Sequence, residues 1–121
     1  MGRMNLDRYC VGERYTIKEV LEQFESYNNR VAIVTSESNK VIGVVSQGDI
    51  LRALSAGRNL YTPVNQIIQN SYLHLYEKDM GKAYPIFKKK QISLLPIINH
   101  NNELIDFITI EDIYEYLENR P

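Results

Sequence analysis

The chain has 121 residues, 44% of them apolar, which is enough to bury the core of one ordinary domain. Its formal net charge of -1 argues against a nucleic-acid-binding protein, which is usually basic overall or carries a basic stripe. One cysteine excludes an internal disulfide, no apolar run approaches the ~20 residues of a membrane helix, and the polar N-terminus lacks an apolar signal core. We therefore expect a cytoplasmic protein that neither spans a membrane nor binds nucleic acid.

The first half of the chain predicts a helix, two strands and a second helix. Apolar residues recur at helical spacing over residues 17–27, and Thr16 with Glu19 forms a capping box that opens this helix. A polar turn separates the two apolar strands, and Gly57 suits the C-cap of the closing helix. In order, we expect a helix over residues 17–27, strands over residues 31–34 and 41–45, and a helix over Gln47–Ser55.

The second half repeats this order after a connecting segment, residues 58–70. Pro63 and the apolar residues after it predict a short helical turn, and the apolar residues at 73–75 predict one additional strand. Asp79 is the expected N-cap of the next helix, whose end carries the basic run 88–90, where cations suit the helix dipole. We expect a helical stripe over residues 80–87, strands over Leu94–Ile98 and residues 104–108, and a helix over Ile110–Glu118.

Aligning the chain on itself with a shift of 63 positions brings the two halves together without a gap. Ser46 then meets Thr109, and Asp49 meets Asp112. A unit of ~50 residues buries little apolar surface alone, so we expect the two units to pack together as one structure. The expected division is a first repeat over residues 5–60 and a second repeat over residues 61–121.

In both halves a hydroxyl residue is followed three positions later by an aspartate, where a strand ends and a helix begins. In a capping-box variant, the hydroxyl at the N-cap and the carboxylate at N3 satisfy backbone N–H groups of the new helix. In a ligand site, the helix N-terminus binds a phosphate, and the aspartate accepts hydrogen bonds from both hydroxyls of a ribose. Both interpretations stay open, and they are not exclusive.

The two copies differ in charge beside this motif. Arg52 lies on the same helix face as Asp49 and could contact a phosphate, whereas its counterpart is Glu115. Gly48 corresponds to Glu111, so the second copy gains two negative charges. We therefore expect a phosphorylated ligand to prefer the first copy. A surface salt bridge is the alternative role for Arg52.

The stretches "GVVSQGDI" at residues 43–50 and "DFITIEDI" at residues 106–113 share one pattern. It consists of glycine, two apolar residues, Ser or Thr, two variable residues, Asp and an aliphatic residue. Two such motifs, each at the end of a helix–strand–strand unit, resemble a tandem pair of cystathionine-β-synthase-type (CBS) domains, called a Bateman module. The resemblance runs from about residue 7 to residue 117. It implies an α+β chain with an α/β-type CBS fold, in which two helix–strand–strand–helix repeats pack as a pseudo-twofold pair.

The resemblance also implies an adenosine-type regulatory ligand such as AMP, ADP or ATP. The residues that would contact its phosphate and ribose are Ser46 with Asp49, and Thr109 with Asp112. Backbone groups at the strand starts would read the adenine edge, and Pro96, which lacks an N–H, would leave carbonyls free. For Val31 and Ile97 a place in the core is the alternative. The implied adenine-contacting residues are Val31, Ala32, Pro96 and Ile97.

The second motif departs from the family at Asp106, where glycine is usual, and this puts in doubt any close backbone approach there. With this departure, "VVSQGDILRALSAG" followed by "PVNQII", and "LPIINHNNELID", resemble the CBS pairs fused ahead of sugar-phosphate nucleotidyltransferase domains. The chain ends at "YLENRP", where such proteins continue into the catalytic domain. We therefore expect a regulatory piece of a longer polypeptide.

The sequence contains no nucleophile–base motif and no P-loop, and His74 and His100 stand far apart without cysteine or acidic partners for a zinc site. We therefore expect no enzyme. We expect a regulatory module that binds an adenine nucleotide and controls an attached nucleotidyltransferase. The alternative is a structural dimerisation module with empty sites. A homodimer would pack through apolar helix residues, namely Ile50, Leu51, Leu54, Ile113, Tyr114 and Leu117.

Overall fold

The computed structural model of the chain describes residues 6–68 and 71–120. The chain divides into two compact units, Met1–Tyr72 and Leu73–Pro121. The repeat boundary that we expect between residues 60 and 61 comes from the sequence repeat and stays a prediction. In the structure, the connecting segment packs on the first unit, because Ile17 N–H donates to Thr62 O at 2.9 Å and Val64 is buried in the first core.

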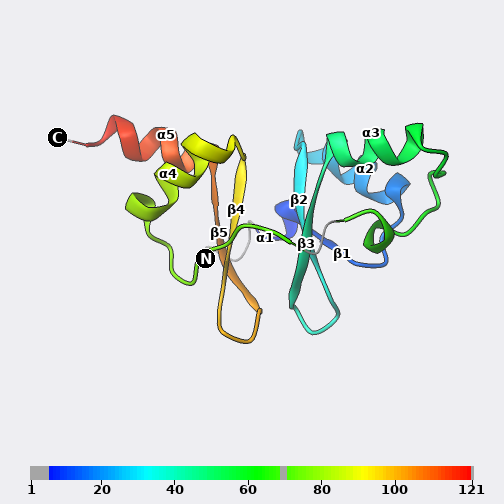
Figure 1. The fold of residues 1–121 in the computed structure, drawn as a ribbon, viewed down its shortest axis with the longest axis horizontal. Helices are drawn as coiled ribbons and strands as arrows, with labels where there is room; N and C mark the ends of the chain where they lie inside the picture. The colour runs from blue at the N-terminus through cyan, green and yellow to red at the C-terminus, as the bar shows by residue number, and fades with distance from the viewer. Residues whose placement is uncertain (1–5, 69–70, 121) are drawn as a thin grey trace. The chain divides into compact units, whose positions relative to one another are not determined.

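The first unit is a three-stranded sheet covered by helices. Its strands lie in the order β1-β2-β3, with β1 parallel to β2 and β2 antiparallel to β3. Figure 1 shows α2 and α3 on one side of β2 and β3. Strand β1 is not among the elements that the sequence pattern predicts. The elements are α1 (Leu6–Tyr9), β1 (Cys10–Gly12), α2 (Ile17–Tyr27), β2 (Val31–Thr35), β3 (Val41–Ser46), α3 (Gln47–Ser55) and the 3-10 turn η2 (Val64–Gln66).

The second unit repeats the same layers. Its antiparallel strands β4 and β5 have α4 and α5 on one side (Figure 1). The additional strand expected at residues 73–75 is present as a single parallel bridge between Leu75 and Ile97, in which Leu75 N–H donates to Pro96 O at 3.1 Å. The elements are α4 (Met80–Lys90), β4 (Leu94–Ile98), β5 (Leu104–Thr109) and α5 (Ile110–Glu118).

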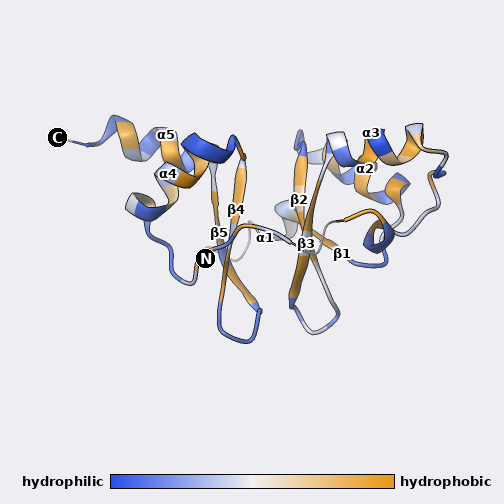
Figure 2. Ribbon diagram, viewed as in Figure 1, coloured by the Kyte–Doolittle hydropathy of each residue, from blue (hydrophilic) through white to orange (hydrophobic). Residues whose placement is uncertain are grey.

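Each unit has its own apolar core between its sheet and its helices. The strands and the inner stripes of the helices are the apolar parts of both units in Figure 2. In the first core, the α2 stripe meets β2, β3 and α3; its buried members are Val11, Ile17, Val20, Phe24, Ala32, Val34, Val45, Ile50 and Val64. In the second core, the buried members are Ala83, Phe87, Leu95, Ile97, Ile108 and Ile113. The apolar patterns of the sequence therefore predicted the helix faces correctly.

The backbone repeats with the same shift of 63 positions as the sequence. The non-glycine residues with positive φ form two equivalent pairs: Asn28 and Gln91 end α2 and α4, and Asn39 and Asn102 lie in the two hairpin turns. The strand irregularities fall at equivalent places, between residues 34 and 35 and between residues 97 and 98. Side-chain caps also recur, because Thr16 opens α2 and Asp79 opens α4. The predicted helix–strand–strand–helix repeat is therefore confirmed within each unit.

Candidate functional site

The first candidate site lies at the N-terminus of α3, where Ser46 and Asp49 form a capping box. Ser46 Oγ accepts a hydrogen bond from the Asp49 N–H at 3.2 Å, and Asp49 Oδ2 accepts one from the Ser46 N–H at 2.9 Å. The Gln47 N–H donates to Arg30 O at 2.9 Å. The capping interpretation is therefore correct for this pair. The N–H of Gly48 also belongs to the first turn, where N–H groups lack an acceptor within the helix.

The second candidate site has the same capping geometry at the N-terminus of α5. Thr109 Oγ1 accepts from the Asp112 N–H at 3.1 Å, and Asp112 Oδ2 accepts from the Thr109 N–H at 2.8 Å. The Ile110 N–H donates to Ser93 O at 2.9 Å, which repeats the contact between Gln47 and Arg30. Both copies therefore hold a hydroxyl and a carboxylate at a helix N-terminus in the same arrangement.

Arg52 joins the first site through an ion pair with Asp49. Its Nη2 donates to Asp49 Oδ1, which is the carboxylate oxygen that the cap does not use. The Arg52 side chain is 72% exposed, whereas the Asp49 side chain is 22% exposed. A Cβ at Gly48 would lie 3.3 Å from Arg52 Nη1 and 3.7 Å from Ser46 Oγ. The guanidinium therefore lies beside Gly48, and the salt-bridge alternative for Arg52 is confirmed.

In the second site, carboxylates take the places of Gly48 and Arg52. Glu111 and Glu115 are both exposed, and neither forms an ion pair with any residue that the structure describes. A pocket of about 340 Å³ adjoins this site and is lined by Met80, Asp112, Glu115, Tyr116 and Asn119. Because two carboxylates line the pocket, it suits a phosphate poorly.

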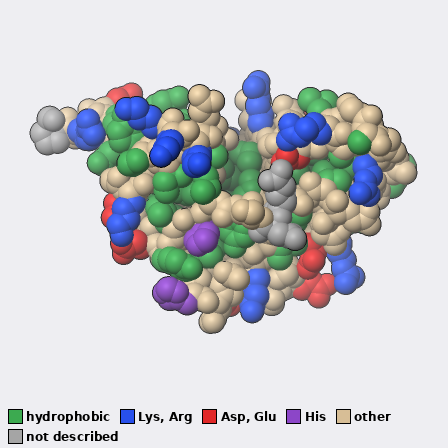
Figure 3. Space-filling view, viewed as in Figure 1, with side chains coloured by type: hydrophobic (Ala, Val, Ile, Leu, Met, Phe, Trp, Pro, Cys, Tyr) green, Lys and Arg blue, Asp and Glu red, His purple; other side chains and the backbone are tan. Residues whose placement is uncertain are grey.

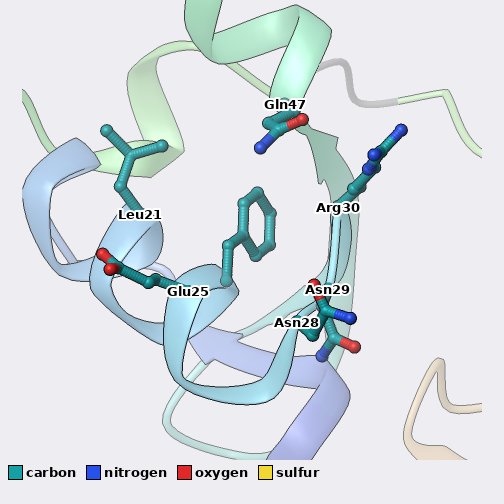
Figure 4. Close-up of a pocket in the computed structure, with 7 residues that line it drawn as sticks. Leu21, Glu25, Asn28, Asn29, Arg30 and Gln47 are labelled. Carbon is teal, nitrogen blue, oxygen red and sulfur yellow. The ribbon is translucent and has the colours of Figure 1, made fainter.

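A second pocket lies on the first unit, between the end of α2 and the start of α3. It has a volume of about 400 Å³ and is lined mostly by polar side chains. Figure 4 shows the Gln47 side chain turned into this pocket, whereas Arg30 extends away from it. Sequence reasoning missed both residues, because they are brought together only by the pairing of β2 with β3. The lining residues are Leu21, Phe24, Glu25, Asn28, Asn29, Arg30 and Gln47.

The four residues implied for the adenine edge fall into different environments. Val31 pairs with Ser46 across β2 and β3, so its backbone lies beside the first cap. Ala32 and Ile97 are buried in the two cores, as the core alternative anticipates for Ile97. The Pro96 carbonyl accepts the Leu75 N–H at 3.1 Å, and which carbonyls the missing N–H of Pro96 leaves free stays a prediction. Contact between any of these residues and an adenine stays a prediction.

Asp106, at the family's glycine position, is accommodated by local polar contacts. Its Oδ1 accepts from the Phe107 N–H at 2.8 Å, and its Oδ2 lies 3.6 Å from Lys78 Nζ. Its side chain is partly exposed, so the carboxylate reaches both a partner and solvent. The strand therefore tolerates this departure without a glycine.

The two histidines lie closer together than their sequence separation suggests. The Tyr76 ring stacks on His100 with centroids 4.5 Å apart and meets His74 edge-on at 5.1 Å.

Within residues 6–68 and 71–120, no group of three or more His, Cys, Asp or Glu side chains could hold a metal ion. None of the helices described there is long and apolar enough to cross a membrane. On the face shown in Figure 3, Lys and Arg side chains are dispersed over both units rather than gathered in one stripe.

The chain is similar in sequence to longer proteins. It is 28% identical over 116 residues to a protein of Methanocaldococcus jannaschii, covering 83% of this chain and 41% of that protein. It is 30% identical over 83 residues to the arabinose 5-phosphate isomerase GutQ of Escherichia coli, covering 68% of this chain and 26% of the isomerase. The chain therefore spans less than half the length of these two relatives.

Solved structures of CBS domain proteins share the fold. A CBS domain protein from Pyrobaculum aerophilum complexed with AMP has a TM-score of 0.73 and 24% identity, covering 93% of this chain and 92% of that one. The CBS domain pair of protein MJ0100, in complex with 5′-methylthioadenosine and S-adenosyl-L-methionine, has a TM-score of 0.75 and 18% identity, covering 90% of each chain.

The CBS domain family matches residues 4–56 and 76–119, one stretch in each repeat. Each stretch contains one of the two capping pairs, so the motifs that suggested the resemblance lie inside the matched regions. CBS domains are regulatory modules rather than catalytic ones. The chain therefore belongs to the CBS domain family and carries a tandem pair of CBS domains.

Proposed function

We propose that the chain is a regulatory module that binds an adenine nucleotide, with the Ser46 side of the pair as the better phosphate site. The observation that carries this proposal is the cluster at the start of α3. There, a hydroxyl, a carboxylate and a guanidinium meet beside Gly48. Two CBS proteins of the same fold support the ligand class, because one is complexed with AMP and the other with adenosine derivatives.

The cap leaves the groups that a nucleotide needs. Ser46 Oγ accepts the Asp49 N–H, yet its own O–H stays able to donate to a phosphate oxygen. Asp49 uses one lone pair on each oxygen, so it can accept further hydrogen bonds from ribose hydroxyls. Arg52 and the positive end of the α3 dipole both favour a phosphate. The first site is therefore suited to a phosphate next to a diol.

Titration of AMP, ADP, ATP and GTP into the chain tests this function. A ligand that binds only the folded state at 100 times its dissociation constant should stabilise the chain by about 2.7 kcal/mol, which a thermal shift measures. Asp49→Asn should lower the affinity for AMP more than Asp112→Asn does. Each variant keeps a side-chain oxygen that can accept the cap hydrogen bond. If none of the four nucleotides stabilises the chain, the proposal is wrong; if the two variants lose AMP equally, the preference for the first site is wrong.

We also infer that the module controls an attached enzyme domain in the cytoplasm. Its similarity to part of an arabinose 5-phosphate isomerase supports attachment to sugar-phosphate chemistry. A sugar-phosphate nucleotidyltransferase remains our specific proposal, based on the stretches quoted from the sequence. The genomic sequence downstream of the codon for Pro121 tests it, because this proposal expects a nucleotidyltransferase domain there in the same reading frame. A different domain there would replace this part of the proposal.

A second candidate function is dimerisation, which a specific surface favours. Leu51 on α3 is 63% exposed, and Tyr114, its equivalent on α5, is 58% exposed. Large apolar side chains at equivalent helix positions suit contact with a second copy of the chain. Sedimentation equilibrium should show a dimer that Leu51→Ser and Tyr114→Ser weaken, whereas Leu60→Ser, at another exposed leucine, should not. A monomer at every concentration would exclude this role.

A further inference from the structure

We propose that Arg52 makes the first site discriminate between phosphorylated and unphosphorylated adenine ligands. It does so by closing on Asp49 when no phosphate is present. This inference rests on the proposed nucleotide-binding function and adds the residue that sets its specificity. It predicts that loss of Arg52 changes the affinities for AMP and for adenosine in opposite directions.

The ion pair uses the Asp49 oxygen that the cap leaves over. Asp49 Oδ2 is held by the Ser46 N–H as part of the cap, so it is fixed by the helix start. Oδ1 is the outward oxygen, and the Arg52 guanidinium donates to it. Each carboxylate oxygen can accept more than one hydrogen bond, so a ribose hydroxyl can share Oδ1 with Arg52, but it then meets a carboxylate whose charge the guanidinium already partly neutralises.

The ion pair is easily opened. The Arg52 side chain is 72% exposed, and exposed ion pairs contribute little to stability. Arg52 is therefore able to turn from Asp49 to a phosphate without disturbing the helix. A phosphate compensates for the lost ion pair with charge-assisted hydrogen bonds, whereas adenosine offers nothing in return. The same side chain thus attracts AMP and opposes adenosine.

Gly48 leaves room for the Arg52 guanidinium beside Asp49. The second unit has other residues at the positions equivalent to Gly48 and Arg52. A Cβ at position 48 would already lie 3.3 Å from Arg52 Nη1, so a larger side chain would push the guanidinium away. The equivalent positions in the second unit hold Glu111 and Glu115. There, Asp112 has Thr109 as its hydrogen-bond partner and no cation paired with it among the residues that the structure describes. The second site therefore lacks the closing cation and should not favour AMP over adenosine.

The test is a comparison of AMP and adenosine binding to the whole chain and to Arg52→Gln. Backbone amide signals in ¹⁵N NMR separate the sites, because Gly48 reports on the first and Glu111 on the second. The Gly48 signal should show that Arg52→Gln lowers the affinity for AMP by about 10- to 100-fold, the range expected for a lost charge-assisted hydrogen bond. The same variant should raise the affinity for adenosine by about two- to fivefold, the range expected for removing an exposed ion pair.

Two further variants sharpen the result. Lys18→Gln removes an exposed cation from α2 and should leave both affinities unchanged. Arg52→Lys keeps the charge but loses the planar fork, so its AMP affinity should lie between those of the wild type and Arg52→Gln. The inference is overturned if Arg52→Gln changes the affinities for AMP and adenosine in the same direction, or if the ratio of the two affinities stays constant. If AMP moves neither amide signal in the wild type, the nucleotide-binding function itself is wrong.

Discussion

Removing the N-cap hydroxyls should lower the free energy of unfolding even without a ligand. Ser46 and Thr109 each accept the N–H of the N3 residue, and a Ser or Thr N-cap replaced by Ala costs about 1 kcal/mol. Thr109 is only 7% exposed, so Thr109→Ala also loses a buried methyl group, which contributes about 0.8 kcal/mol. We therefore expect a loss of about 1 kcal/mol for Ser46→Ala and about 2 kcal/mol for Thr109→Ala.

Guanidinium unfolding at constant m-value measures both losses, and each 1 kcal/mol should lower Tm by about 3–5 °C for a chain of this size. Two variants of Thr109 separate its parts: Thr109→Ser keeps the hydroxyl, and Thr109→Val keeps the methyl shape. Thr109→Val should cost about 1 kcal/mol, because the Asp112 N–H then loses its acceptor. If Thr109→Val is as stable as the wild type, the hydroxyl does not contribute as a cap, and our reasoning about this pair is refuted.

Three further predictions concern stability. Pro85 lies inside α4 at an exposed position, so Pro85→Ala should raise the free energy of unfolding by about 1–3 kcal/mol; an unchanged Tm would show that the helix already adapts to the proline. Asn102 has φ 63°, so Asn102→Val should cost about 1–2 kcal/mol and Asn102→Gly almost nothing, and equal losses in chemical unfolding would contradict this. Lys78→Gln should cost less than about 0.5 kcal/mol and lose its effect in high salt, whereas a salt-independent loss would point to a structural role for this ion pair with Asp106.

The features that sequence reasoning predicted correctly are local ones. The capping box at Thr16 and the Asp79 cap depend on residues three positions apart, and the helix faces depend on a short period. β1 escaped prediction because it has three residues and is held by parallel pairing with a strand about 20 residues away. The strand expected at residues 73–75 could be placed beside β4 only in the structure, since Leu75 comes from a separate segment. Local sequence patterns do not predict which distant segments pair with each other.

The structure shows that capping and ligand binding use different parts of the same residues. Each cap consumes a hydroxyl lone pair and one carboxylate oxygen, and it is equally well made in both units. The positions that differ between the units, Gly48 against Glu111 and Arg52 against Glu115, take no part in the capping hydrogen bonds. The capping hydrogen bonds therefore do not account for the difference between the units at these two positions. A difference in charge beside a helix N-terminus acts directly on the anions that this terminus binds, which is why the two sites should differ in their ligands.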